Sequence, residues 1–138
     1  MNNVALRFLE VSKIYKLKKI IRVSCDSPFI DHRIIDKGIL LAKKSNYDII
    51  TNVFPRSFPK GLSFEIIKTS IIKKHLIYFS KKEKEHVTTY FYKNSKKFKI
   101  YNFQARKNYS QLNLCLDTSK DLSFLRNNYS KILKKNFV

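Results

Sequence analysis

Glycine, tryptophan and acidic residues are scarce in this chain of 138 residues. It has 2 glycines, no tryptophan, and 10 Asp and Glu residues against 29 Lys and Arg residues. Gly38 and Gly61 stand alone, so the sequence lacks a glycine-rich loop of the kind that binds phosphates through backbone amides. No apolar run approaches the ~18 residues that a membrane span needs. No charged-then-apolar leader is present, so we expect a cytoplasmic protein that does not enter a membrane.

Length and composition predict a single folded domain, residues 1–138, with free thiols. The hydrophobic fraction of 43%, with 14% aromatic residues, excludes a disordered chain. Cys25 and Cys115 lie too far apart in sequence to form a metal-binding knuckle. Two cysteines could form a disulfide, but a reducing cytoplasm disfavours it, so we predict buried thiols.

The formal net charge of +19 admits two interpretations. A basic nucleic-acid-binding domain is one of them. Against it, the basic residues are spread along the whole chain, and Lys greatly outnumbers Arg, the residue that base-edge and bidentate phosphate contacts favour. Abundant Lys, Ile, Asn, Phe and Tyr with scarce Gly is also what an AT-rich coding sequence produces without any nucleic-acid partner. We therefore keep nucleic-acid binding as an alternative and do not expect it.

Apolar periodicity predicts helices that alternate with strands. The expected helices are residues 3–17, 31–44, 69–80, 83–94 and 118–133, and the expected strands are residues 19–24, 47–53, 62–66, 97–104 and 111–116. Asp31 is expected to cap the second helix, and Thr118 with Asp121 the last one. The residues expected to face the core are Val4, Phe8, Leu9, Val11 and Tyr15 in the first helix and Leu122, Leu125, Tyr129 and Leu133 in the last. This alternation predicts an α/β fold with a mostly parallel sheet.

The segment Arg22–Asp31 is the most informative stretch of the chain. A β-branched run ends in Asp26, and Pro28 and Asp31 follow it. Ligands of open α/β sheets sit just beyond the carboxyl ends of the strands, so Asp26 is placed to hold a metal or a polar ligand. The simpler interpretation is a strand that runs into an Asp-Pro turn.

Five segments, in this order and at these spacings, resemble the bacterial cytidylyltransferases of the spore-coat-polysaccharide and acylneuraminate type. They are Arg22–Pro28, Asn52, Phe58–Leu62 with Glu65, Glu85–Thr88 and Leu116–Leu122. The resemblance runs from Val4 to Leu133 and covers the C-terminal two-thirds of such an enzyme. It implies a three-layer, Rossmann-like nucleotide-diphospho-sugar transferase fold. It also implies transfer of a cytidylyl group from CTP to a sugar acid or related sugar, with release of pyrophosphate, for surface polysaccharide synthesis.

The resemblance also implies the site residues. Asp26 and Asp117 would be the catalytic carboxylates and would hold Mg²⁺, the expected cofactor. Both follow expected strands, so we expect their side chains to lie close together. The residues implied for substrate binding are Asn52, Arg56, Gly61, Glu65 and His86, with Lys60 beside them. The plainer alternatives are a helix-start turn for Asp117, a closed turn for Asn52, an outward strand residue for Glu65, solvated surface for Arg56 and Lys60, and a structural histidine for His86.

One part of the family pattern has no counterpart in the sequence. Members of the family begin with a strand and a Gly/Ser-containing turn that cradles the triphosphate. We therefore expect the chain to be catalytically incomplete by itself, with an open sheet edge. The expected partners are CTP, a sugar acceptor, and either a separately encoded N-terminal half or a second copy of the chain. An inactive remnant or regulatory module of the same fold is the alternative to an enzyme.

Overall fold

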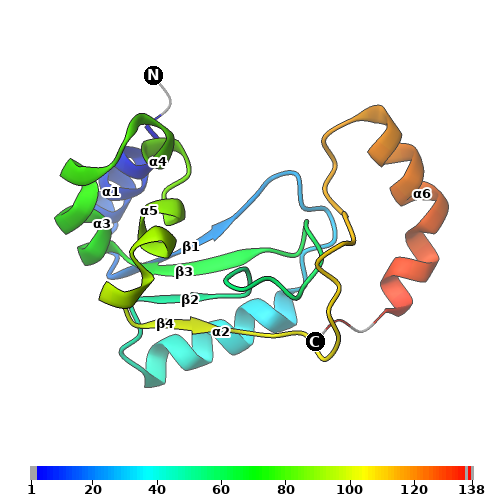
Figure 1. The fold of residues 1–138 in the computed structure, drawn as a ribbon, viewed down its shortest axis with the longest axis horizontal. Helices are drawn as coiled ribbons and strands as arrows, with labels where there is room; N and C mark the ends of the chain where they lie inside the picture. The colour runs from blue at the N-terminus through cyan, green and yellow to red at the C-terminus, as the bar shows by residue number, and fades with distance from the viewer. Residues whose placement is uncertain (1–2, 136, 138) are drawn as a thin grey trace.

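Four strands form one sheet with helices on both faces in the computed structural model, which describes residues 3–135 and 137 (Figure 1). The strands are β1 (Lys19–Val23), β2 (Ile49–Thr51), β3 (Phe64–Lys68) and β4 (Ile100–Asn102). The α-helices are α1 (Val4–Ile14), α2 (His32–Lys44), α3 (Thr69–His75), α4 (Lys81–Glu85), α5 (Thr88–Lys93) and α6 (Ser119–Lys134). Two short 3-10 helices are η1 (Leu76–Tyr78) and η2 (Ser95–Lys97).

The sheet has the order β1-β3-β2-β4 and is mixed in direction. β3 runs antiparallel to both β1 and β2, and β2 and β4 are parallel. The prediction of a mostly parallel sheet is therefore wrong. Parallel neighbours need a crossover, usually a helix, and the connection from β2 to β3 contains no helix. The chain instead turns back, and β3 lies between β1 and β2.

Helix α2 packs closely against one face of the sheet. It begins as predicted, because the Asp31 carboxylate accepts a hydrogen bond from the Arg33 N–H at 2.9 Å. A Cβ on Gly38 would lie 2.7 Å from the Phe64 ring, so glycine permits this close approach. The buried core on this face is Ile34, Ala42, Ile50, Phe58, Leu62, Phe64, Ile66, Leu114, Leu125, Ile132 and Phe137.

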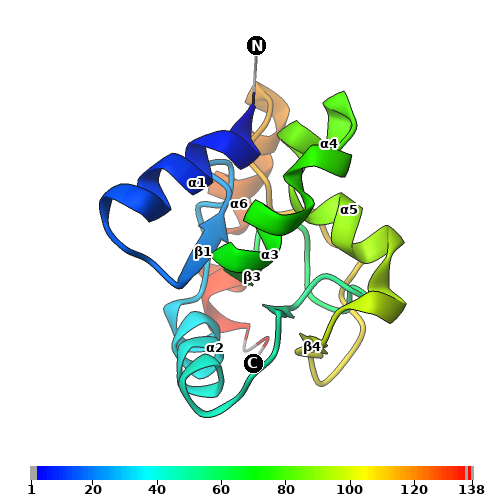
Figure 2. The same cartoon turned by 90° about the vertical axis from the view of Figure 1, so that its left-hand side faces the viewer.

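Helices α1, α3, α4 and α5 cover the opposite face (Figure 2). The buried core there is Ala5, Leu9, Ile20, Ile49, Ile67, Ile72, Phe79, Val87 and Phe91. The face predicted for α1 is wrong at two positions, since Val11 and Tyr15 are 45% and 69% exposed. Ser12 is buried instead, and this costs little because its hydroxyl donates a hydrogen bond to the Phe8 carbonyl at 2.6 Å.

The two long helices expected between β3 and β4 are shorter and broken. α3 ends at His75, and a capping box of Ser80 and Glu83 starts the short α4. The alternation of Leu62, Phe64 and Ile66 predicts a half-buried strand, but β3 is buried continuously from Phe64 to Ile67. Helices cover both faces of β3, so its apolar residues are buried on both sides, and Glu65 is buried among them.

Helix α6 lies apart from the other helices, beyond one end of the strands (Figure 1). The predicted capping box starts it: the Thr118 hydroxyl accepts from the Asp121 N–H at 3.2 Å, and the Asp121 carboxylate accepts from the Thr118 N–H at 2.8 Å. Tyr129 and Leu133, which we expected to face inward, are more than half exposed. Nowhere in residues 3–135 is a helix both long and apolar enough to cross a membrane.

Candidate active site

Three side chains that can bind a metal ion meet where β1 ends and the segment before α6 passes it. They are Asp26, Cys115 and Asp117, and their carboxylate oxygens and thiol sulfur lie within 4.8 Å of one another. The expectation that Asp26 and Asp117 lie close together is confirmed. Cys115 is the member that the sequence interpretation missed, because it was considered only as a partner for Cys25.

Main-chain hydrogen bonds hold the segment before α6 in this place. The Lys60 N–H donates to the Leu112 carbonyl, and the Leu114 N–H donates to the Lys60 carbonyl, both at 2.9 Å. Further along, the Leu116 N–H donates to the Asp26 carbonyl at 2.8 Å. The strand predicted at residues 111–116 is therefore wrong: the segment is extended, but it makes only an isolated bridge between Lys60 and Asn113. These bonds, and not a sheet edge, bring Asp117 to Asp26.

Gly61 makes the close passage of this segment possible. Its φ of +87° lies in the left-handed region, which favours glycine. A Cβ at this position would lie 2.6 Å from the carbonyl carbon of Leu114. The structure thus gives Gly61 a backbone role beside the candidate site, and its predicted contact with substrate stays a prediction.

The two aspartates differ in their surroundings. The Ser27 hydroxyl donates a hydrogen bond to the Asp26 carboxylate at 3.0 Å. Asp117 is exposed, and within the described residues no side chain or main-chain N–H donates to its carboxylate. The capping box of α6 uses Thr118 and Asp121, so the helix start does not occupy the Asp117 carboxylate. Its oxygens are therefore available to a ligand.

The charges around Cys115 are of both signs. Burial raises the pKa of the Cys115 thiol, and the neighbouring carboxylates Asp26 and Asp117 raise it further, while Arg56 and Lys60 oppose them. Cys115 is half-buried and Cys25 is exposed, and neither is in a disulfide. The prediction of buried thiols is therefore wrong for Cys25.

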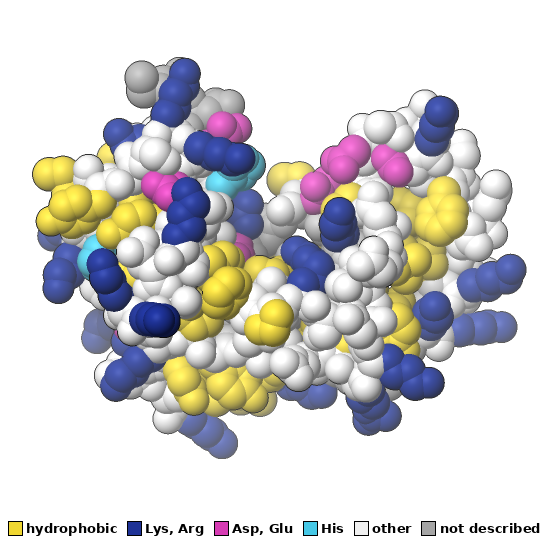
Figure 3. Space-filling view, viewed as in Figure 1, with side chains coloured by type: hydrophobic (Ala, Val, Ile, Leu, Met, Phe, Trp, Pro, Cys, Tyr) yellow, Lys and Arg dark blue, Asp and Glu magenta, His cyan; other side chains and the backbone are white. Residues whose placement is uncertain are grey.

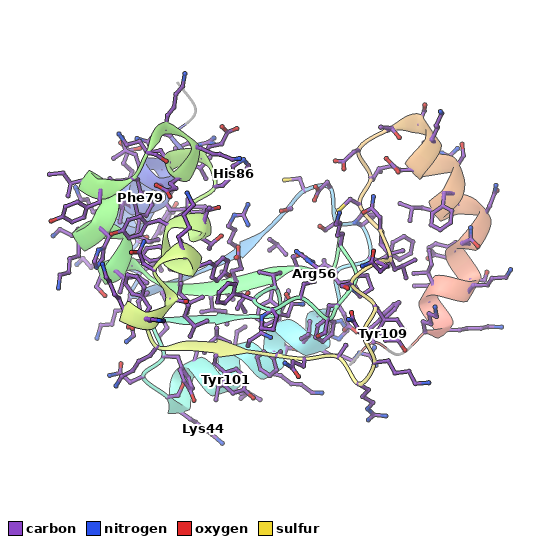
Figure 4. All side chains as sticks on the ribbon, viewed as in Figure 1. Lys44, Arg56, Phe79, His86, Tyr101 and Tyr109 are labelled. Atoms are coloured by element: carbon purple, nitrogen blue, oxygen red, sulfur yellow. The ribbon has the colours of Figure 1, made fainter. Side chains whose placement is uncertain are left out.

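Arg56 lies in the middle of the molecule, between the side formed by α3–α5 and the side formed by α6 (Figure 4). Its guanidinium donates hydrogen bonds to the Ser63 hydroxyl at 2.9 Å and to the Pro59 carbonyl at 3.4 Å. Figure 3 shows that the surface is hollowed between these two sides. His86 is exposed on the α4–α5 side, outside the cluster of Asp26, Cys115 and Asp117 (Figure 4).

Asn52 and Glu65 are buried and already have protein partners. The Asn52 amide donates to the Leu62 carbonyl at 2.7 Å and accepts from the Phe64 N–H at 3.0 Å. It therefore fastens the loop that precedes β3, as the plainer interpretation of a closed turn implied. Glu65 is 3% exposed and not an outward strand residue. Direct substrate contacts by either side chain stay predictions, and each would require these bonds to change.

Glu65 is paired with two residues that the sequence interpretation did not select. The Arg22 guanidinium donates to its carboxylate at 2.7 Å, and the Tyr92 hydroxyl donates to the other carboxylate oxygen. Burial, followed by the Glu65 charge, raises the pKa of Tyr92 well above its usual range. Arg22 and Glu65 face each other in the antiparallel register of β1 and β3. This pairing was not predicted, because a mostly parallel sheet was expected.

A separate cavity of about 830 Å³ lies between the start of α2 and α6. Its walls are largely apolar, and they include Phe29, Leu125 and Tyr129. It touches the candidate site only through the neighbouring residues Pro28 and Leu116. The three donors Asp26, Cys115 and Asp117 do not line this cavity.

Comparison with known proteins assigns the family. The family model described as "Cytidylyltransferase" matches residues 1–135, so the chain belongs to the cytidylyltransferase family. The resemblance stated from the five motifs and the predicted fold class are both confirmed. A solved cytidylyltransferase from Leptospira borgpetersenii serovar Hardjo-bovis has the same fold, with a TM-score of 0.78 and 24% identity over 99% of this chain and 68% of that one.

A curated relative is the uncharacterized protein MJ1063 of Methanocaldococcus jannaschii. It is 30% identical over 118 residues, which are 83% of this chain and 47% of the relative. The chain thus spans about half the length of this relative.

Proposed function

We propose that this chain carries the metal- and acceptor-binding part of an enzyme that transfers a cytidylyl group from CTP to a sugar acid or related sugar, releasing pyrophosphate, for surface polysaccharide synthesis. The observation that carries the proposal is the convergence of Asp26 and Asp117 beyond the end of β1. A carboxylate pair at the carboxyl end of a strand is where an α/β sheet binds a charged ligand. Family membership supplies the cytidylyl chemistry.

In this proposal Asp26 and Asp117 hold Mg²⁺. Carboxylate oxygens are the ligands that Mg²⁺ prefers, and it usually binds one or two of them together with substrate phosphates. When bound, the ion would offset the repulsion between the attacking oxygen and the α-phosphate. The Ser27 hydroxyl orients Asp26 for this role by its hydrogen bond to the carboxylate.

The substrate groups in this proposal lie over the hollow between the two sides of the molecule. Arg56, together with Lys60, faces the phosphate or carboxylate of the substrate, since both act electrostatically on the Cys115 thiol next to the aspartates. His86 contacts the sugar from the α4–α5 side. Arg22 and Glu65 form an ion pair between the neighbouring strands β1 and β3.

The triphosphate needs further donors in this proposal. Both glycines of the chain serve packing, Gly38 against Phe64 and Gly61 against Leu114, so neither forms a phosphate cradle. We propose that a second polypeptide segment, encoded separately or belonging to another copy of the chain, supplies the cradle. It would pair with the edge of the sheet at β1, which bonds only to β3 within the described residues.

Binding of CTP with Mg²⁺ to the isotope-labelled chain, followed by NMR, tests the function. We expect Mg²⁺-dependent shifts at Asp26, Arg56 and Asp117, and at least tenfold weaker binding in Asp26→Asn and Asp117→Asn. Asp36→Asn removes an exposed carboxylate of α2 and is the matched control. The chain alone should release little pyrophosphate with any acid sugar. Shifts that ignore Mg²⁺, or binding unchanged in both aspartate variants, would contradict the proposal.

A further inference from the structure

The third donor in the cluster, Cys115, bears on which metal ion the site prefers. Its sulfur lies within 4.8 Å of an oxygen of Asp26 and of an oxygen of Asp117. Tetrahedral ligands with bonds of ~2.0–2.3 Å lie ~3.3–3.5 Å apart, so side-chain movements of roughly 1 Å would let all three donors bind one ion. The geometry therefore fits one cation with one sulfur and two oxygen ligands.

A thiolate changes the chemistry of such a site. Mg²⁺ takes oxygen ligands, whereas Zn²⁺ and Co²⁺ accept sulfur and oxygen together. Three protein donors also leave a fourth position open in tetrahedral geometry, as in catalytic zinc sites, where a phosphate oxygen can bind. Two carboxylates alone offer only oxygen ligands, so they would not favour Zn²⁺ or Co²⁺ over Mg²⁺ through a sulfur ligand.

The position of Cys115 in the fold supports a role for this thiol and not for the other one. Cys115 is half-buried, and the hydrogen bonds of Leu114 and Leu116 on either side of it hold its main chain. Cys25 adjoins Asp26 in the sequence, yet it is exposed and lies outside the cluster. The chain therefore contains its own matched control.

We propose that Cys115 is a metal ligand that makes this site bind thiophilic divalent ions of the Zn²⁺ and Co²⁺ class more tightly than Mg²⁺. The inference rests on the proposed function, since it adds a donor to the metal site proposed there. Cys115 then determines metal choice, and the two aspartates supply binding to either kind of ion. Replacing the sulfur should alter Co²⁺ binding and leave Mg²⁺ binding nearly unchanged.

Titration of the chain with Co²⁺ tests this assignment directly. A thiolate bound to Co²⁺ gives a charge-transfer absorption in the near ultraviolet. We expect this band in the natural chain and in Cys25→Ser, and its loss in Cys115→Ser with at least tenfold weaker Co²⁺ binding. Mg²⁺ affinity should change less than threefold in Cys115→Ser. A band that survives in Cys115→Ser, or natural-chain affinity no higher for Co²⁺ than for Mg²⁺, would overturn the proposal.

A second measurement uses the natural chain and does not depend on a variant folding. Zn²⁺ should slow alkylation of Cys115 by N-ethylmaleimide at least tenfold, while Cys25 still reacts, as followed by peptide mass spectrometry. Equal labelling of Cys115 with and without Zn²⁺ would overturn the proposal. The outcomes also separate the two proposals. Loss of nucleotide binding in the aspartate variants without protection of Cys115 contradicts the metal preference only, whereas protection of Cys115 without CTP binding contradicts the proposed function only.

Discussion

At the scale of single residues, the candidate site depends on Gly61 as much as on the aspartates. Gly61 has no ligand atom of its own, but its backbone lets the segment that carries Cys115 and Asp117 pass within hydrogen-bonding distance of Lys60. A side chain here would meet the main chain of Leu114, which cannot move aside as a flexible side chain can. The position of the metal donors is therefore set by a residue outside the donor set.

Gly61→Ala should destabilise the fold and weaken the site together. The positive φ and the contact with the Leu114 carbonyl group should cost about 2 kcal/mol or more of the free energy of unfolding. Urea denaturation measures this cost, and the Co²⁺ titration measures the loss of metal affinity. Lys37→Ala is the control, since it removes an exposed side chain of α2 outside the candidate site. Equal stability of Gly61→Ala and the natural chain would contradict this account.

At the scale of elements, the caps of the long helices α2 and α6 were predicted correctly, whereas the strand directions were not. The caps at Asp31 and Thr118 are local, because each side chain bonds to a main-chain group two or three residues away, and both are confirmed. The direction of β3 depends on which strands it meets, and no local pattern records that. The ion pair of Arg22 and Glu65 follows from the same antiparallel pairing, so it was missed too.

The candidate site was also predicted only in part from the sequence. The closeness of Asp26 and Asp117 was predicted because both follow expected strands, but the segment before Asp117 is not a strand of the sheet. Cys115 lies beside these aspartates because its neighbours Leu114 and Leu116 form main-chain hydrogen bonds to Lys60 and Asp26. A Cys two residues before an Asp carries no metal signal by itself, because it becomes a donor only where another segment brings a carboxylate to it.

Helix α4 provides a prediction on pH. Lys93, followed by Ser80, lowers the pKa of the Glu83 carboxyl from 4.5 to about 2. Because the pKa of Glu83 is lower in the folded chain than in the unfolded chain, the ionised carboxylate stabilises the fold above pH 4.5. This stabilisation is lost as the pH falls from about 4.5 towards 2. Glu83→Gln should therefore cost about 1 kcal/mol at pH 6 and much less at pH 3. Urea denaturation at both values checks this.

Glu85→Gln is the matched control for α4, since Glu85 is an exposed glutamate on the same short helix. It should leave the stability nearly unchanged at both pH values. A cost for Glu83→Gln that stays constant between pH 6 and pH 3 would show that Glu83 does not act through its charge.

At the scale of the whole molecule, charge and exposed apolar surface have opposite effects on self-association of the chain. Lys and Arg side chains are spread over the whole of the face seen in Figure 3 and do not gather in one patch. A net charge of +19 keeps copies of the chain apart. The edge of the sheet at β1 favours their contact, because Ile21 and Val23 are 40% and 43% exposed beside it.

We expect the isolated chain to self-associate through this edge at moderate salt, where charge repulsion is screened. Ile21→Lys or Val23→Lys should raise the dimer dissociation constant at least about tenfold, which corresponds to ~1.4 kcal/mol of lost contact. Sedimentation equilibrium measures the constant. Ile77→Lys is the control, since Ile77 is 84% exposed on η1, outside the sheet. Association weakened equally by Ile77→Lys, or absent at every concentration, would contradict the role of the edge.

The hydrogen bond between the Leu116 N–H and the Asp26 carbonyl joins a segment near the beginning of the chain to one near its end. A ribosome adds ~5–20 residues per second, so Asp26 is made several seconds before Cys115 and Asp117. During that interval β1, β2 and β3 can pair, while Asp26 has neither of its companions. The cation site is thus among the last parts of the molecule to form. A nascent chain that stops before residue 115 would contain all four strands and Asp26, but neither Cys115 nor Asp117.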